Sequence, residues 1–130
     1  MGEEFGDTNL KSFEWYLKIA EQGDDVAQSE LGKMYALGKG VRKDYKEAVR
    51  WFRKAAEQGL KYAQADLGSM YAKGWGVPKD FIQAYMWYDL ASKSGYDLAR
   101  SNLGKLAKHM TRAQITKARQ LAREWTAQSH

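Results

Sequence analysis

Apolar residues recur at intervals of three and four between residues 45 and 56, which is the spacing of one face of an α-helix. Asp44 precedes this segment, and Glu47 follows three residues later, a pattern typical of the capping box at a helix N-terminus. Gly59 comes after the last apolar residue and suits the left-handed conformation in which many helices end. The sequence therefore predicts an amphipathic helix between Asp44 and Gly59. Its apolar or small positions are Tyr45, Ala48, Val49, Trp51, Phe52, Ala55 and Ala56.

The same pattern returns along the chain with a period of 36 residues. A fixed period of a few tens of residues is typical of a solenoid, in which each unit buries its apolar face by stacking on a neighbour. One structural unit is therefore repeated along this chain. The residues that mark the period are Trp15, Trp51 and Trp87, then Gly23, Gly59 and Gly95, and then the pairs Leu31-Gly32, Leu67-Gly68 and Leu103-Gly104.

Each unit contains two predicted helices joined by a glycine-rich connection. First helices are expected over residues 25–37, 61–72 and 97–108. Second helices follow Asp44 and Asp80, and Gln83 completes a capping box with Asp80. The connections carry glycines that permit positive φ in a tight turn, at Gly38, Gly40, Gly74 and Gly76.

The two ends of the chain depart from the full unit. Residues 8–21 form only a second helix, and Thr111 with Gln114 makes a capping box for a closing helix. The apolar stripe of that closing helix is Ile115, Ala118, Leu121, Ala122 and Trp125. We expect one all-α domain, residues 1–130, with about seven helices. Its expected parts are a half repeat over 8–23, repeats over 24–59 and 60–95, and a partial repeat with a capping helix over 96–130.

Glycine inside a helix costs roughly 1 kcal/mol relative to alanine, so the glycines within the first helices need a compensating contact. We expect the backbone of a neighbouring helix to approach them closely, with tryptophan and tyrosine side chains filling the space beside it. The recurrent aromatic residues are expected in the core. The glycines are Gly32, Gly68 and Gly104, and the aromatic residues are Trp15, Trp51, Trp87, Tyr35 and Tyr71.

The repeat residues carry a family resemblance. The string Ala63-Gln-Ala-Asp-Leu-Gly-Ser-Met-Tyr71, followed by Gly74-Trp-Gly-Val77, Asp80, Ala84 and Trp87, resembles the Sel1-like repeat, a relative of the tetratricopeptide repeat. The preceding copy, from Ala27 to Gly59, is similar to the same motif. This resemblance implies a right-handed α-solenoid that acts as an adaptor, without catalytic machinery and with the first helices lining the concave face.

Charge is distributed unevenly along the chain, although the net charge is only +5. Residues 1–24 carry a net charge of −4, whereas residues 100–130 carry +6. Such a gradient has two readings, a solvated surface or an attraction between opposite ends that allows weak head-to-tail self-association. The basic closing segment could also bind an anionic surface or nucleic acid.

The inventory of reactive side chains disfavours an enzyme. The chain has no cysteine, so a thiolate zinc site is excluded. It has two histidines, His109 and His130, so few residues are available for a histidine-based metal site or a catalytic triad. His109 is expected on a helix surface, and Asp44 and Asp80 are expected to be helix caps. The glycine pairs lack the further residues of a phosphate or dinucleotide loop. We therefore expect no catalytic residue, cofactor or metal.

The repeat register suggests a binding face. Taking Leu31-Gly32 as the register mark, lysines, small residues and apolar residues of the first helices would line a groove suited to an acidic peptide or helix. A second reading is that these lysines only keep the surface soluble. Trp75, between two glycines, is expected to be an exposed contact residue. The expected groove residues are Val26, Ser29, Lys33, Leu37, Tyr62, Ala65, Ser69, Lys73, Leu98, Ser101, Lys105 and Lys108.

These observations favour a non-catalytic adaptor or scaffold whose partner is another protein. The alternative is binding of nucleic acid or an anionic surface through the basic closing helix, where Trp125 alone offers little for base stacking. Residues 1–7 are acidic and no segment is long and apolar enough to span a membrane. A cytoplasmic location is the default expectation, and a periplasmic or secreted one if a signal peptide was removed.

Overall fold

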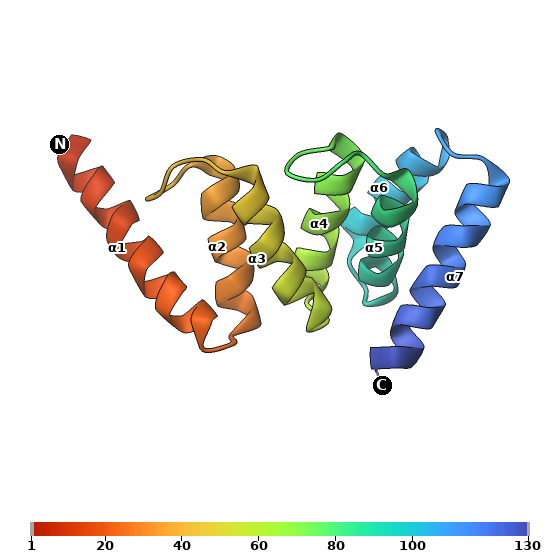
Figure 1. Cartoon of the computed structure of the whole chain (residues 1–130), viewed down its shortest axis with the longest axis horizontal. Coiled ribbons are helices and arrows are strands. Elements are labelled where there is room, and N and C mark those ends of the chain that lie inside the picture. The colour runs from red at the N-terminus through yellow and green to blue at the C-terminus, as the bar shows by residue number, and fades with distance from the viewer. Residues whose placement is uncertain (1, 130) are drawn as a thin grey trace.

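The computed structural model describes the backbone of residues 2–129 and the side chains of residues 8–129. Seven α-helices follow one another along the long axis of this part of the chain, from α1 at one end to α7 at the other (Figure 1). The predicted all-α repeat architecture is confirmed. The helices are α1 Gly2–Glu21, α2 Asp25–Leu37, α3 Tyr45–Glu57, α4 Lys61–Lys73, α5 Phe81–Lys93, α6 Asp97–Ala107 and α7 Arg112–Ser129. Helix α1 thus begins at Gly2, earlier than the predicted Thr8.

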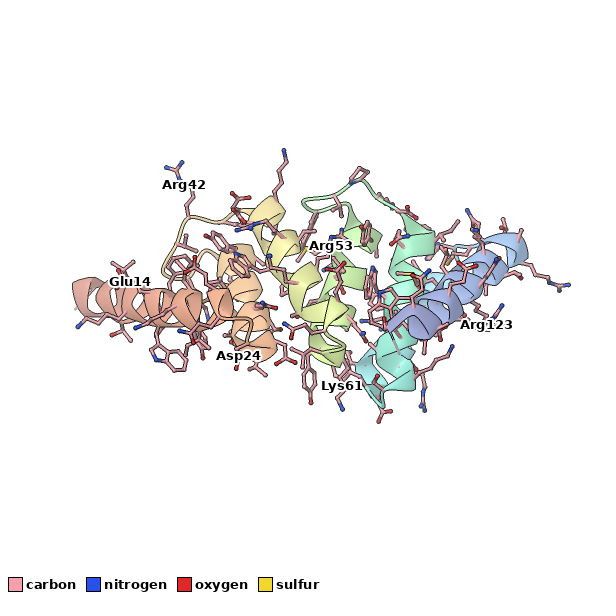
Figure 2. The ribbon with its side chains drawn as sticks, turned by 60° about the horizontal axis from the view of Figure 1, so that its bottom comes forward. Glu14, Asp24, Arg42, Arg53, Lys61 and Arg123 are labelled. Carbon is pink, nitrogen blue, oxygen red and sulfur yellow. The ribbon has the colours of Figure 1, made fainter. Side chains whose placement is uncertain are left out.

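Helices that are neighbours in sequence pack against each other from α1 to α6. The closing helix breaks this order, because α7 packs against α5. In Figure 2, Glu14 on α1 and Arg123 on α7 lie at opposite ends of the molecule. The acidic and basic ends expected from the sequence are therefore separated by the length of the helical stack.

The recurrent tryptophans differ in burial. Trp51 and Trp87 are 4% and 3% exposed, as predicted, but Trp15 is 59% exposed, so its assignment to the core is wrong. Trp51 is buried in a cluster with Ala20 of α1 and Leu31 of α2, the two helices before its own. Trp15 belongs to the first helix of the described chain, where no preceding helix pair lies within residues 2–129 to cover it.

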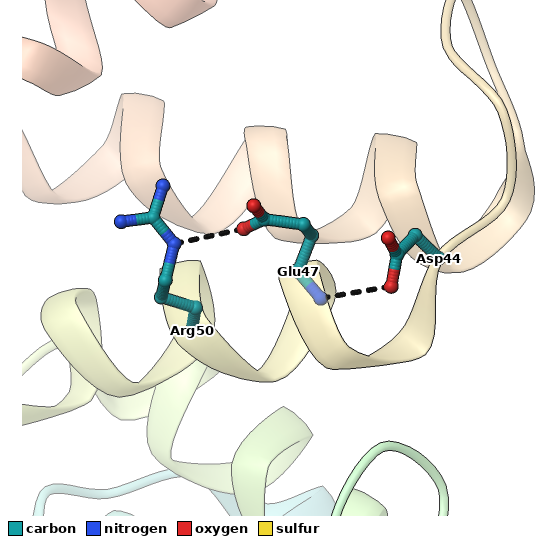
Figure 3. A network of polar contacts seen from close by, with 3 residues as sticks. All are labelled: Asp44, Glu47 and Arg50. Carbon is teal, nitrogen blue, oxygen red and sulfur yellow. Dashed lines mark hydrogen bonds and ion pairs between the residues drawn. The ribbon is translucent and has the colours of Figure 1, made fainter.

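Aspartate caps begin α3 and α5. In Figure 3, the backbone N–H of Glu47 donates to Asp44 Oδ1 over 3.1 Å, while the Glu47 carboxylate accepts a 2.8 Å hydrogen bond from Arg50 Nε. The Asp44 N–H donates instead to the Tyr35 carbonyl over 2.9 Å, so the reciprocal half of the predicted capping box is not formed. The cap itself is confirmed here and at Asp80, whose Oδ1 accepts from the Gln83 N–H over 3.1 Å.

Both halves of the box are present at the start of α7. The Thr111 N–H donates to Gln114 Oε1 over 2.8 Å, and the Gln114 N–H donates to Thr111 Oγ1 over 3.1 Å. Because both backbone donors are satisfied locally, the closing helix has a sharply defined start.

Gly32 and Gly68 lie against the second helix of their unit; the expected backbone contact is present at Gly68, where a Cβ would lie 3.2 Å from the Ala84 carbonyl oxygen, and an aromatic ring is nearer at both glycines. A Cβ on Gly32 would lie 2.6 Å from Phe52 Cδ1, and a Cβ on Gly68 would lie 2.9 Å from Tyr88 Cδ1. These rings belong to the second helix of the same unit, not to the recurrent tryptophans. At Gly104 a Cβ would have no heavy atom within 4 Å, because α7 packs against α5 and leaves this face of α6 open.

The connecting loops hold successive units together. Gly40 has φ 74° and Gly76 has φ 77°, and a Cβ at either residue would collide with backbone atoms. For Gly40 these atoms belong to Asn9 of α1, and for Gly76 they belong to Tyr45 of α3. Each loop thus packs on the second helix of the preceding unit, at the start of α3 for Gly76 and at the equivalent repeat position within α1 for Gly40. Glycine is required both for the backbone conformation and for the close approach.

Candidate functional site

Two adjoining pockets lie along the side of the molecule formed by α2, α4 and α6. The first encloses about 500 Å³ and the second about 360 Å³. They share Ser69 and Lys73 of α4, and we call the pair the lysine groove. The first pocket is lined by Lys33, Ala36, Leu37, Lys43, Tyr45, Phe52, Asp66, Ser69, Met70, Lys73 and Trp75. The second is lined by Ser69, Ala72, Lys73, Phe81, Tyr88, Asn102, Lys105, Leu106 and His109.

The structure gathers part of the sequence-derived set in this groove. Five of the expected residues line it, namely Lys33, Leu37, Ser69, Lys73 and Lys105. Five others are exposed but line neither pocket, namely Val26, Tyr62, Leu98, Ser101 and Lys108. Ser29 and Ala65 are buried, at 3% and 4% exposure. Ala65 belongs to the core cluster of Tyr88 and Ala84 on α5, so its face of α4 packs against the second helix of the unit.

Asp66, Asn102 and His109 were missed because the register assumed from the sequence was off by one position at each of them. Asp66 and Asn102 follow Ala65 and Ser101 directly and line the pockets in their stead. His109 lies 36 residues after Lys73 and lines the second pocket, whereas Lys108 does not. The period alone could have found His109 by counting on from Lys73.

An aromatic pair forms one wall of the first pocket. The rings of Tyr45 and Trp75 stack with centroids 4.9 Å apart and planes 15° from parallel. Lys43 Nζ lies 4.8 Å from the Tyr45 ring centroid, and Lys73 Nζ lies 4.4 Å from that of Trp75. Trp75 is 41% exposed, as expected, and these contacts hold two ammonium groups beside the rim of the pocket.

Asp66 is the acidic residue that lines the first pocket. Burial raises the pKa of its carboxyl to about 6, while Lys33 lowers this pKa and Glu30 raises it. Lys33 is itself paired with Glu30, with 3.4 Å between Nζ and Oε1. Within residues 8–129, the Asp66 carboxyl has neither a hydrogen bond nor an ion pair. The Asp66 carboxyl is therefore largely enclosed and has no hydrogen-bond or ion-pair partner among the described residues, although lysines line the same pocket.

A polar pair lies at the junction of the two pockets. The hydroxyl groups of Ser69 and Tyr88 are 2.8 Å apart and share a hydrogen bond. Burial raises the pKa of the Tyr88 hydroxyl, an effect that the Ser69 hydrogen bond opposes and the nearby Asp66 carboxylate reinforces. Tyr88 therefore stays neutral and presents a hydroxyl at the groove.

The described side chains show no group of three or more histidine, cysteine, aspartate or glutamate residues that could hold a metal ion. None of the helices in the described part of the chain is long and apolar enough to cross a membrane. The groove itself presents ammonium groups, hydroxyls, the Asp66 carboxyl and apolar surface.

Comparison with known proteins settles the family. The family model of the Sel1 repeat matches residues 7–24, 25–60 and 61–96. The chain belongs to the Sel1 repeat family. No curated protein sequence matches it.

Two solved structures of Sel1 repeat proteins show the same fold. One is c5321, described as a protective antigen present in uropathogenic Escherichia coli strains and displaying an SLR fold; it is 41% identical, with a TM-score of 0.87 over 89% of this chain. The other is a Sel1 repeat protein from Oxalobacter formigenes, 41% identical, with a TM-score of 0.68 over 71% of this chain. This Sel1 repeat chain spans only 25% and 38% of the lengths of those two proteins.

Proposed function

We propose that this Sel1 repeat protein is a non-catalytic adaptor that binds an acidic peptide or helix of a partner protein in the lysine groove. The observation that carries the proposal is the continuity of the two pockets through Ser69 and Lys73 on α4. Together they give a path along three successive first helices, α2, α4 and α6. A path of this kind fits an extended or helical segment better than a compact small molecule.

Charge and apolar surface support an acidic segment with apolar side chains. Lys33, Lys73 and Lys105 line the path, and Lys73 and Lys105 have no ion pair within residues 8–129, so their ammonium groups are available to pair with carboxylates. Leu37, which is 63% exposed, and Trp75 supply apolar contact at the same pocket. Exposed aromatic and aliphatic residues beside basic groups are common anchors of protein interfaces.

The basic closing helix is the weaker candidate for the binding surface. The Trp125 ring packs edge-on against Trp87 with centroids 5.6 Å apart, so it is engaged in the core and not free to stack on a base. Arg119 Nε donates to the Tyr85 hydroxyl over 3.1 Å and so helps to hold α7 on α5. Arg119 and Trp125 of α7 therefore help to hold the closing helix on α5.

The test is selection of binding peptides from a displayed library of random twelve-residue sequences, followed by affinity measurement of the best peptide by fluorescence anisotropy. The variant Lys33→Glu/Lys73→Glu/Lys105→Glu is compared with a control of equal charge, Lys39→Glu/Lys46→Glu/Lys117→Glu, at exposed lysines outside the groove. We expect the selected peptides to be acidic and to contain an aromatic or aliphatic residue. The groove variant should bind the best peptide at least tenfold more weakly than the wild type, whereas the control variant should keep its affinity.

An equal loss in both variants would show that only net charge matters, and the groove proposal would be wrong. Binding of a nucleic-acid oligomer that is weakened by Arg123→Glu and falls steeply with salt would instead support the basic closing helix.

A further inference from the structure

We propose that the pocket between α2 and α4 binds a single carboxylate of the partner directly above Asp66, and that the complex takes up one proton that the two carboxyl groups share. This inference rests on the proposed function and deepens it, because it names the group that occupies the first pocket and makes its binding dependent on pH.

The Asp66 carboxyl forms part of the pocket wall. Asp66 lies among Lys33, Lys43 and Lys73, and all four line the same pocket of about 500 Å³. The excess of positive charge favours an anion as the occupant. Lys43 and Lys73 are held beside the stacked rings of Tyr45 and Trp75, so their ammonium groups are positioned before a partner arrives.

The surroundings of Asp66 leave its carboxyl short of stabilising contacts. The charged and titratable groups around it are Lys33 and Glu30 on α2, Lys43 before α3, Lys73 on its own helix and Tyr88 on α5. Lys33, the cation that lowers the pKa of Asp66, is already paired with Glu30. Burial accordingly raises the pKa of Asp66 to about 6, so that an added proton is acquired at little cost near neutral pH.

A second carboxylate in the pocket would complete this arrangement. Two carboxyl groups that share one site cannot both be charged, so the pKa of one rises strongly and the pair holds one proton. The protonated Asp66 would then donate an O–H···O⁻ hydrogen bond, the shortest and strongest class between carboxyl groups, while the lysines neutralise the remaining charge. The complex would hold more protons than the free components, and linkage requires affinity to rise as pH falls.

The experiment uses the full chain and the acidic peptide selected above, with affinity measured from about pH 7.5 to about pH 5.5, where we expect about a tenfold gain for the wild type. Calorimetry in two buffers of different ionisation enthalpy should show net proton uptake on binding. Asp66→Asn, whose amide donates a hydrogen bond as the protonated acid does, should bind tightly at both pH values without proton uptake. Glu30→Gln, on the neighbouring helix, is the matched control and should keep the pH dependence.

Affinity that does not change with pH, or proton uptake that survives in Asp66→Asn, would overturn this inference while the groove itself remains the binding site. A peptide that binds with unchanged affinity after the triple lysine substitution would overturn the proposed function and this inference together. Circular dichroism of Asp66→Asn checks that a change in binding does not come from a change in fold.

Discussion

The side-chain amide of Gln58 donates a 2.9 Å hydrogen bond to Gln28 Oε1, which joins the end of α3 to the start of α2. Gln28 Nε2 in turn donates to the carbonyl of Ala20 at the end of α1. Gln64 repeats the second contact, donating to the Ala56 carbonyl over 3.2 Å, but its Oε1 is buried without a partner. The residue 36 positions after Gln58 is Ser94, which is too short to repeat the bridge.

This difference predicts unequal costs for equivalent substitutions. Gln28→Leu removes one buried and one partly buried hydrogen bond and should lower the free energy of unfolding by about 1–3 kcal/mol. Gln64→Leu removes one hydrogen bond together with an unsatisfied acceptor, and should cost less than about 1 kcal/mol. Urea denaturation of the two variants checks the order, and a larger loss in Gln64→Leu would contradict the reading of this hydrogen-bond chain.

The glycines of the first helices provide a second pair of variants. Gly32→Ala places a methyl group against the Phe52 ring, which is 1% exposed and cannot move away easily. The strain, about 1–3 kcal/mol, should exceed the helix-propensity gain of about 1 kcal/mol, so the variant should be less stable. Gly104→Ala meets nothing within 4 Å and should be more stable by about 0.5–1 kcal/mol. Thermal unfolding measures both signs in one experiment.

The packing of the closing helix can be tested at its aromatic contact. Trp125→Ala removes the ring that packs on Trp87 and should lower stability by about 2 kcal/mol, since Trp125 is only partly buried. Trp15→Ala, at an exposed ring, should change stability by less than about 0.5 kcal/mol. Unfolding curves followed by circular dichroism compare the two. Equal effects would mean that α7 is not fastened to α5 through this contact.

Asp66 should also make the stability of the unliganded protein depend on pH. Its pKa is about 6 in the folded protein and 3.8 in a model compound, so the folded state binds the proton more tightly. The contribution of this group to stability therefore falls as pH rises from about 4 to about 6. Each pKa unit corresponds to about 1.4 kcal/mol, so a rise of about two units means that Asp66→Asn should be more stable than the wild type by about 3 kcal/mol at neutral pH. An unchanged difference between the two proteins at pH 4 and pH 7 would contradict this expectation.

Local sequence patterns were sufficient for the bounds of most helices and for the aspartate caps of α3 and α5, although not for the start of α1. Helix periodicity, the aspartates at positions 44 and 80, and the glycines that follow the second helices each act within a few residues, so one sequence reveals them. The 36-residue period also predicted that the units stack, because each repeated pair of amphipathic helices can bury its apolar face against the next pair. Trp75 was recognised as exposed because its counterpart in the preceding unit is Lys39.

The sequence by itself determined that this protein is an all-α stack of Sel1 repeats, since periodicity, caps and turn glycines are local or regularly repeated signals. Only the tertiary structure decided which face of each first helix is open. Ala65 is covered by α5 while Asp66, one residue on, lines the groove, a rotation of about 100° around the helix axis that follows from side-chain packing between the helices of a unit. It also decided that Trp15 is exposed while Trp51 and Trp87 are buried, because burial depends on which helices lie beside a residue and not on its place in the repeat.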